Sequence, residues 1–227
     1  MQHGRSSLAG LVLSVAIAFV ITACGGTDTT APESTVSPPS STTTTSIPAE
    51  SSEGAVRTTP SQQEGPYYPV EKPAERDNDL TTVGAGVGLP QGDVLALDGL
   101  LIYSDGSPVA NATIEIWQTD ASGIYLHPDF AGRPTDPAFQ YYGETLTDSV
   151  GEWSFLTILP AAYESRPPHI HVKVLVDGDE VLTTQIYFSS IGSNSATAEA
   201  LLVAEVFPAP AGSDADLMAS HAIVLAG

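Results

Sequence analysis

The sequence predicts an all-β protein, an antiparallel β-sandwich with little helix, from two observations. Short runs in which apolar and polar residues alternate recur throughout residues 93–225, and clusters of Gly, Pro, Asp and Ser separate them. Such alternation gives a strand one apolar face that can pack on a core. Strands at this spacing, joined by polar turns, are typical of an antiparallel sandwich.

Each predicted strand ends at a recognisable turn sequence. The first strand, 93–103, is followed by Ser-Asp-Gly-Ser-Pro, and an Asp-Gly-Asp turn predicts a hairpin between strands 169–176 and 180–188. The other predicted strands are residues 113–118, 142–147, 153–158 and 221–225. Only residues 196–206 have a short helical pattern, and the glycine-rich stretch 71–92 is expected to be irregular.

Residues 1–23 have the layout of a secretory signal peptide. Arg5 precedes the apolar residues 8–21, and small residues stand directly before Cys24. The arrangement resembles the bacterial lipoprotein signal, which implies export and a lipid anchor at Cys24 on the outer face of a bacterial cell membrane. The alternatives are an ordinary signal peptide with an incidental cysteine, or one membrane-spanning helix, for which the apolar run is short.

Residues 24–61 differ in composition from the rest of the chain. About half of residues 25–61 are Ser or Thr, Pro is frequent, and aromatic residues are absent. Such a segment cannot bury enough apolar surface to offset the conformational entropy lost on ordering, so we expect a disordered tether. The folded domain is therefore predicted to cover residues 62–227.

The chain is strongly acidic, with 7 Lys and Arg residues against 27 Asp and Glu residues and a net charge of -20. Nucleic acid is excluded as a partner, because no basic stripe is present to displace its counterions. A dianionic ligand would also be repelled on approach. The single cysteine excludes an intrachain disulfide, and nothing in the composition determines the oligomeric state.

The strongest chemical signal is a pair of histidines on one predicted strand. Pro167 and Pro168 forbid a helix and hold the approach to this strand extended. Side chains two residues apart on a strand share a face, so His169 and His171 point the same way and the apolar residues form the opposite face. Two imidazoles placed in this way are suited to hold a transition metal. The alternative is a solvated polar face, because His-x-His alone is weak evidence.

Other motifs accompany these histidines in a fixed order. Trp117 precedes Tyr125 by eight residues, Tyr163 and Arg166 precede the His-x-His pair, and a Thr-Thr-Gln-Ile-Tyr-Phe segment follows it. Together these motifs resemble the intradiol ring-cleavage dioxygenase family over residues 64–188. The short interval between Tyr163 and the first histidine resembles the secreted, single-chain branch of that family.

The resemblance implies one ferric iron, Fe(3+), per chain. The implied iron ligands are Tyr125, Tyr163, His169 and His171. Arg166 and Gln185 would be catalytic, and Tyr67 and Trp117 would line the substrate site. The implied reaction opens a catechol between its two hydroxyls with O2 and gives a muconate-type product. Phenolate and imidazole suit a transition metal, and the anionic oxygens favour the ferric state.

Each assignment also has a simpler alternative. The two tyrosines could be ordinary strand residues, and Arg166 could pair with Glu164. Gln185 could be one more residue of a polar face, and His127 is expected to be solvated rather than a fifth ligand. For the whole protein, the alternatives are a non-catalytic β-sandwich binding lipoprotein and a protein that captures ferric catecholates. The scarcity of basic residues favours a neutral catechol over a carboxylated one.

Overall fold

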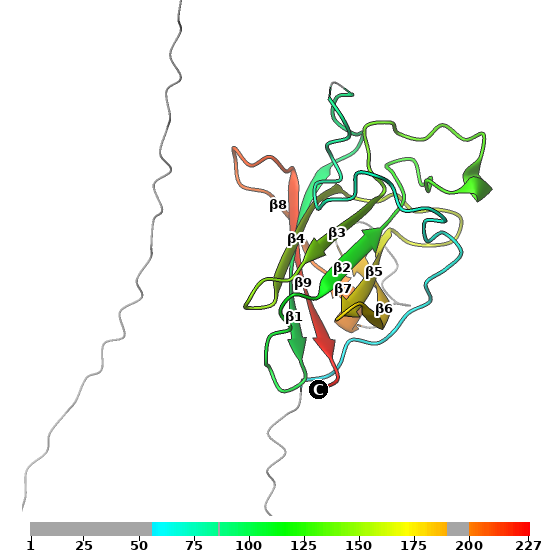
Figure 1. Cartoon of the computed structure of the whole chain (residues 1–227). Coiled ribbons are helices and arrows are strands. Elements are labelled where there is room, and N and C mark those ends of the chain that lie inside the picture. Colours follow the sequence, from blue (N-terminus) through cyan, green and yellow to red (C-terminus); the bar gives the residue numbers. More distant parts are fainter. Residues whose placement is uncertain (1–55, 86, 190–199) are drawn as a thin grey trace, which may run out of the picture. The chain divides into compact units, whose positions relative to one another are not determined.

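The computed structural model describes residues 56–85, 87–189 and 200–227, so the predicted signal peptide, Cys24 and the tether up to residue 55 lie outside the described residues. In the described chain two β-sheets pack face to face around one core (Figure 1). The predicted all-β sandwich is confirmed. No helix in this part of the chain is long and apolar enough to cross a membrane.

The two sheets contain four and five strands, in the orders β4–β1–β9–β8 and β3–β2–β5–β6–β7. The first sheet consists of β1 (Val94–Tyr103), β4 (Glu152–Ile158), β8 (Val206–Pro208) and β9 (Leu217–Leu225). The second consists of β2 (Thr113–Trp117), β3 (Tyr142–Leu146), β5 (His169–Val176), β6 (Asp179–Phe188) and β7 (Val203–Ala204). Every strand predicted from alternation is present, although β9 begins earlier than predicted.

Most strands pair antiparallel as predicted, but both sheets are mixed. β9 runs parallel to β1, and β7 runs parallel to β6. The β1–β9 pair joins the beginning of the sandwich to its end, in the register Leu95↔Leu217 to Tyr103↔Leu225. Alternation within a strand predicts which face is buried, but it carries no information on the direction of a partner far away in the sequence.

The core lies between the inner faces of the two sheets. Ile170, Val172 and Val174 of β5 are fully buried, as predicted for the face opposite the histidines. Gly99 of β1 also faces the core. The Trp153 ring occupies the space that a side chain at position 99 would need, since a Cβ on this residue would lie 2.0 Å from Cζ2 of Trp153. This apolar packing anchors β5 and leaves its outer face for the two imidazoles.

The predicted hairpin between β5 and β6 is also present. Asp177 and Gly178 have φ values of 53° and 88°, in the left-handed region that both central residues of a type I′ turn occupy. A bulge between Val174 and Leu175 shifts the register set by this turn by one residue and places Gln185 opposite His171. The turn and the bulge together therefore bring the Thr-Thr-Gln segment beside the histidines.

The helix predicted at residues 196–206 is wrong over its described part. That part begins with a single 3-10 turn, η3 (Ala200–Leu202), and continues into β7 and β8. Val203 pairs with β6 and Val206 with β9, and β-branched residues favour such pairing over a helix. Residues 196–199 lie outside the described chain.

The predicted start of the domain at residue 62 is too late. The Thr59 side chain is buried, and its backbone N–H donates to the Val224 carbonyl over 2.9 Å. The Pro60 carbonyl accepts a hydrogen bond from the Thr184 hydroxyl. Composition alone placed these residues in the tether, because Thr and Pro carry no apolar pattern. The stretch 71–92 is irregular as predicted, apart from a bridge between Asp79 and Leu156.

Candidate active site

β5 presents both predicted imidazoles on the outer face of the five-stranded sheet. Their Nε2 atoms are 3.2 Å apart, and Nε2 of His171 is also 3.2 Å from the Tyr125 hydroxyl. Nδ1 of His169 lies 2.7 Å from the Pro167 carbonyl. Because a carbonyl only accepts, this Nδ1 carries the proton and Nε2 keeps its lone pair.

Both imidazoles are buried and neutral. Burial lowers the pKa of His169 to about 4. Burial also lowers the pKa of His171 well below its usual value, and the neighbouring His169 and Arg166 add to this effect. A neutral imidazole with a free Nε2 lone pair is the form that binds a metal ion.

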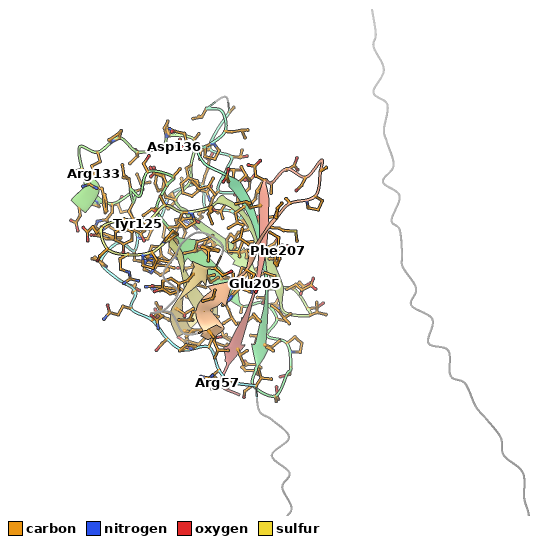
Figure 2. All side chains as sticks on the ribbon, turned by 180° about the vertical axis from the view of Figure 1, so that it is seen from behind. Arg57, Tyr125, Arg133, Asp136, Glu205 and Phe207 are labelled. Atoms are coloured by element: carbon orange, nitrogen blue, oxygen red, sulfur yellow. The ribbon has the colours of Figure 1, made fainter. Side chains whose placement is uncertain are left out.

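Tyr125 follows β2 at the end of a tight loop that Asp120 organises. The buried Asp120 carboxylate accepts the backbone N–H groups of Ser122 over 2.8 Å and Ile124 over 3.0 Å. It also accepts the Tyr141 hydroxyl over 2.8 Å. Tyr125 is buried, and Figure 2 shows it in the half of the described chain that carries Arg133 and Asp136, away from Arg57. The carboxylate thus fixes the direction in which the chain delivers Tyr125.

Tyr163 lies in the loop after β4 and packs directly against the Tyr125 loop. The Asp120 carbonyl accepts the Ala161 backbone N–H over 3.2 Å. Gly123, with a φ of 74°, approaches the second loop so closely that a Cβ would lie 2.5 Å from a main-chain carbonyl oxygen. The rings of the two tyrosines meet edge to face, with centroids 5.1 Å apart. Two phenols from loops that follow strands of different sheets are therefore held side by side.

The four predicted ligands converge, and their chemistry fits a transition-metal ion. The predicted ligands are Tyr125, Tyr163, His169 and His171. Burial raises the pKa of both phenols, and a bound cation would reverse this effect and favour the phenolates. The described residues contain no group of three or more His, Cys, Asp and Glu side chains that could hold a metal. The Tyr125 hydroxyl, 3.2 Å from Nε2 of His171, adds an oxygen donor beside these histidines.

A tight turn brings Arg166 to the same site. Glu164 has a φ of 50°, and the Arg166 backbone N–H donates to the Tyr163 carbonyl over 2.8 Å. The guanidinium donates to Oε1 of Gln185 over 2.6 Å and to the Tyr187 hydroxyl over 3.1 Å. The alternative that Arg166 pairs with Glu164 is wrong, because no carboxylate in the described chain forms an ion pair with Arg166.

A cavity of about 290 Å³ opens beside Arg166. Its lining residues are Gln62, Gln63, Ser165, Arg166, Pro167, Gln185 and Tyr187. Gln185 is 1% exposed, and its Nε2 donates to the Gln63 carbonyl over 2.8 Å, so it is not simply a residue of a solvated polar face. The lining offers amides, hydroxyls and a single cationic group, and it includes no carboxylate.

The segment 62–72, here termed the strap, crosses the outer face of the second sheet. Lys173 of β5 pairs with Glu64 of the strap over 2.6 Å, and Lys72 of the strap pairs with buried Glu115 of β2 over 2.6 Å. Lys173 also lies 3.9 Å from the centroid of the Tyr68 ring. In each pair the sheet residue is buried, but the side chain of the strap residue is 42% exposed for Glu64 and 35% exposed for Lys72, so the pairs help to hold the strap in place without being fully buried.

The predicted lining residues, Tyr67 and Trp117, both contact the ligand set. The Tyr67 ring lies 4.9 Å from that of Tyr125 and 5.8 Å from that of Tyr163. Trp117 stacks on the His171 imidazole with centroids 4.7 Å apart and an interplanar angle of 10°. Both residues therefore orient ligand rings, and their contact with a substrate stays a prediction.

His127 is not solvated, contrary to the prediction. Its side chain is 9% exposed and packs against Tyr67, with ring centroids 5.5 Å apart. Its Nδ1 caps the short helix η1 (Pro128–Phe130) by accepting the Asp129 backbone N–H over 3.3 Å. The hydrogen-bond role and the aromatic neighbours explain the burial, and no contact joins His127 to either strand histidine.

Sequence reasoning missed three groups that shape the site. Asp120 opens the Asp-Ala-Ser-Gly turn sequence after the predicted strand 113–118, which by itself suggests no role beyond the turn. Lys173 lies two residues after His171, so strand periodicity places it on the same face as the imidazoles. Tyr187 lies two residues after Gln185 and shares its face for the same reason. Their partners come from distant segments, which explains why periodicity alone gave them no role.

Comparisons with known proteins identify the family of this all-β sandwich. The family model described as Dioxygenase matches residues 63–205, well over half of the chain. The chain therefore belongs to the intradiol ring-cleavage dioxygenase family, and the predicted family is confirmed.

Two curated relatives illustrate the similarity. The chain is 38% identical over 136 residues to the protocatechuate 3,4-dioxygenase beta chain of Burkholderia cepacia, covering 56% of this chain and 57% of the relative. It is 34% identical over 151 residues to catechol 1,2-dioxygenase of Acinetobacter baylyi, covering 59% of this chain and 47% of the relative. The chain thus spans about half the length of the curated relatives it matches.

Solved structures support the same fold. The dioxygenase domain of a dioxygenase carbohydrate-binding protein fusion from Streptomyces sp. SirexAA-E has a TM-score of 0.60 and 28% identity, covering 75% of this chain and 99% of that chain. The 3-chlorocatechol 1,2-dioxygenase from Rhodococcus opacus 1CP has a TM-score of 0.61 and 26% identity, covering 75% of this chain and 73% of that chain.

Proposed function

We propose that this protein is an iron(III)-dependent dioxygenase that opens catecholic rings between the two hydroxyls with O2 and gives muconate-type products. The observation that carries the proposal is the convergence of four donor side chains beside Arg166, with the two imidazole Nε2 atoms 3.2 Å apart. Family membership and the named relatives support the reaction class.

Tyr125, Tyr163, His169 and His171 would hold the iron. A bound ferric ion would act as a Lewis acid and as a template for both catechol oxygens. The two phenols must lose their protons to bind a cation, and their raised pKa values mean that iron uptake releases protons and strengthens as the pH rises. The imidazoles bind without losing a proton at neutral pH, because burial keeps them neutral.

Arg166 would supply a fixed positive charge where negative charge develops on the substrate. It is suited to this role because its guanidinium is half-buried and carries no carboxylate partner in the described chain. A preorganised charge of this kind stabilises a transition state without reorganisation cost. Tyr67 and Trp117 would limit water access to the ligands from the strap side.

A neutral catechol is the proposed substrate. Arg166 is the only cationic side chain among the residues that line the cavity beside it, and the chain as a whole has a net charge of -20. A carboxylated catechol would find no second cation there and would approach against the field of the protein. Equal kcat/KM values for catechol and a carboxylated catechol would contradict this part of the proposal.

We also propose that the enzyme acts outside the cytoplasm, anchored by lipid at Cys24. The signal-like residues 1–23 and the only cysteine of the chain support this. Expression of the full chain in a bacterium with a lipoprotein pathway is expected to place the protein in the membrane fraction. The Cys24→Ser variant should leave that fraction. Retention of the variant in the membrane would contradict lipidation at Cys24.

The decisive experiment uses a purified fragment that begins at residue 56, loaded with iron. We expect a visible tyrosinate-to-iron charge-transfer band, oxygen uptake with catechol and a muconate-type product. Tyr163→Phe should weaken the band and abolish turnover, while Tyr103→Phe, on β1 of the other sheet, should change neither. Colour without oxygen uptake would favour the protein that captures ferric catecholates. A colourless, metal-free domain would favour the non-catalytic binding lipoprotein.

A further inference from the structure

Arg166, Gln185 and Tyr187 form a closed triangle of hydrogen bonds beside the ligands. The guanidinium donates to Oε1 of Gln185 over 2.6 Å and to the Tyr187 hydroxyl over 3.1 Å. The same hydroxyl donates to Oε1 of Gln185 over 2.6 Å. Each side of the triangle is therefore a hydrogen bond, and two of the three converge on one amide oxygen.

The donors and acceptors of this triangle fix the orientation of every group in it. Nε2 of Gln185 donates to the Gln63 carbonyl of the strap over 2.8 Å, so the amide cannot flip without turning donors toward Arg166. The Tyr187 hydroxyl accepts one hydrogen bond and donates one, which uses its single proton. The amide oxygen accepts from both partners, so it has no lone pair left over for a substrate hydroxyl.

Tyr187 joins this triangle to the metal ligands. β5 and β6 pair in the register that places Tyr187 opposite His169. The Tyr187 ring lies 5.6 Å from the His169 imidazole at an angle of 35°, and Tyr187 is 8% exposed. The ring is thus held by packing, and the hydroxyl position follows from the position of β6 rather than from a flexible side chain.

We propose that Tyr187 is a positioning residue for Arg166, and that Gln185 acts with it rather than on the substrate. The inference rests on the proposed function, in which Arg166 is the charged group that meets the substrate. A free arginine side chain populates many rotamers and loses catalytic value with them. With no carboxylate in the described chain paired to Arg166, the triangle is what holds its direction while leaving its charge uncompensated.

The test is Tyr187→Phe, which keeps the ring on His169 and removes only the hydroxyl. Its control is Tyr142→Phe, which removes another buried hydroxyl, bonded to Glu144 over 3.0 Å. Misplacing the guanidinium by about 1 Å should lower kcat by about 100-fold. Iron content, the charge-transfer band and KM should stay close to wild type, since the ligands are untouched. The control should keep wild-type kcat.

A second readout does not depend on turnover. Hydrogen exchange of the Arg166 guanidinium protons, followed by 15N NMR and assigned with Arg166→Lys, should be slow in the metal-free wild type. Exchange should be about 10-fold faster in Tyr187→Phe, because one of the two hydrogen bonds of the guanidinium is lost. Unchanged exchange together with unchanged kcat would overturn the proposal, and so would a fall in iron content equal to the fall in kcat.

A variant that does not fold and a failure of the proposed function can each be told apart from a failure of the triangle. If Tyr187→Phe does not fold, Gln185→Met, which removes the shared acceptor, should give the same loss of kcat and the same fast exchange. Wild-type values in Gln185→Met would then refute the triangle. If the wild type shows no oxygen uptake with any catechol, the proposed function fails, while the exchange measurement still decides whether Tyr187 holds Arg166.

Discussion

At the scale of single residues, burial without a hydrogen-bond partner sets the protonation state of a side chain. His221 is the clearest case outside the site. It lies on the core side of β9, in register with Gly99 and Trp153 across three strands. It is 5% exposed, and its Nε2 has no hydrogen-bond partner. Burial alone lowers the pKa of His221 to about 4. The folded protein therefore tolerates this imidazole only in its neutral form.

Acid should destabilise the protein through His221. The unfolded chain takes up the proton near the usual pKa of 6.5, but the folded chain resists it down to about 4. The stabilising contribution is present above pH 6.5 and is lost as the pH falls toward 4. Between pH 7 and pH 5 the wild type should lose about 2 kcal/mol more unfolding free energy than His221→Leu.

Urea unfolding of the iron-loaded wild type and His221→Leu at both pH values measures this difference. Iron keeps the site histidines out of the comparison, because metal-bound imidazoles do not titrate in this range. Parallel stability curves for the two proteins would show that His221 is accessible to protons in the folded state.

At the scale of elements, the site depends on how two loops from different sheets are joined. The loop after β2 carries Tyr125, the loop after β4 carries Tyr163, and Asp120 connects them. Its carboxylate organises the first loop, and its carbonyl accepts a backbone N–H of the second. The sequence predicted both loops and both tyrosines, but the contact between the loops depends on how the two sheets pack.

Asp120→Ala should loosen both tyrosine loops. It leaves two backbone N–H groups and the buried Tyr141 hydroxyl without their acceptor, which should cost about 3 kcal/mol of unfolding free energy. Iron content should fall as well, because the two phenols are no longer held together. Urea unfolding and metal analysis measure both effects.

Asp105→Ala is the matched control for that variant. Asp105 also accepts the N–H of the residue two positions later, over 2.9 Å, but in an exposed turn. The control should keep wild-type iron content and a wild-type urea midpoint. Equal loss of iron in both variants would contradict a specific role for Asp120.

At the scale of the whole molecule, residues 59 and 60, whose composition resembles that of the tether, close the sandwich. The Thr59 N–H donates to the Val224 carbonyl, and the Val224 N–H donates to the Thr59 hydroxyl, each over 2.9 Å. The Pro60 carbonyl accepts from Thr184 over 2.8 Å. These bonds tie the beginning of the described chain to β9 and β6, and they lead directly into the strap over the site.

A fragment that begins at residue 62 should be less stable than one that begins at residue 56. It loses the three hydrogen bonds of Thr59 and Pro60 and the longer Val56–Ser104 backbone bond, and it leaves the buried Val224 N–H without a partner, a cost of about 3 kcal/mol. A fragment that begins at residue 59 keeps the three bonds of Thr59 and Pro60 and should nearly match the longer one. Equal urea midpoints for all three fragments would show that residues 59–61 contribute nothing.

The sequence by itself determined every strand except β7 and β8, the β5–β6 hairpin and the order of the site motifs, because alternation and turn chemistry are encoded within a few neighbouring residues. It also placed His169 and His171 on one face. Only the tertiary structure decided the parallel pairing of β1 with β9, the path of the strap and the direction of Arg166. Those features join segments far apart in the chain, and their geometry follows from how the two sheets pack rather than from any local pattern.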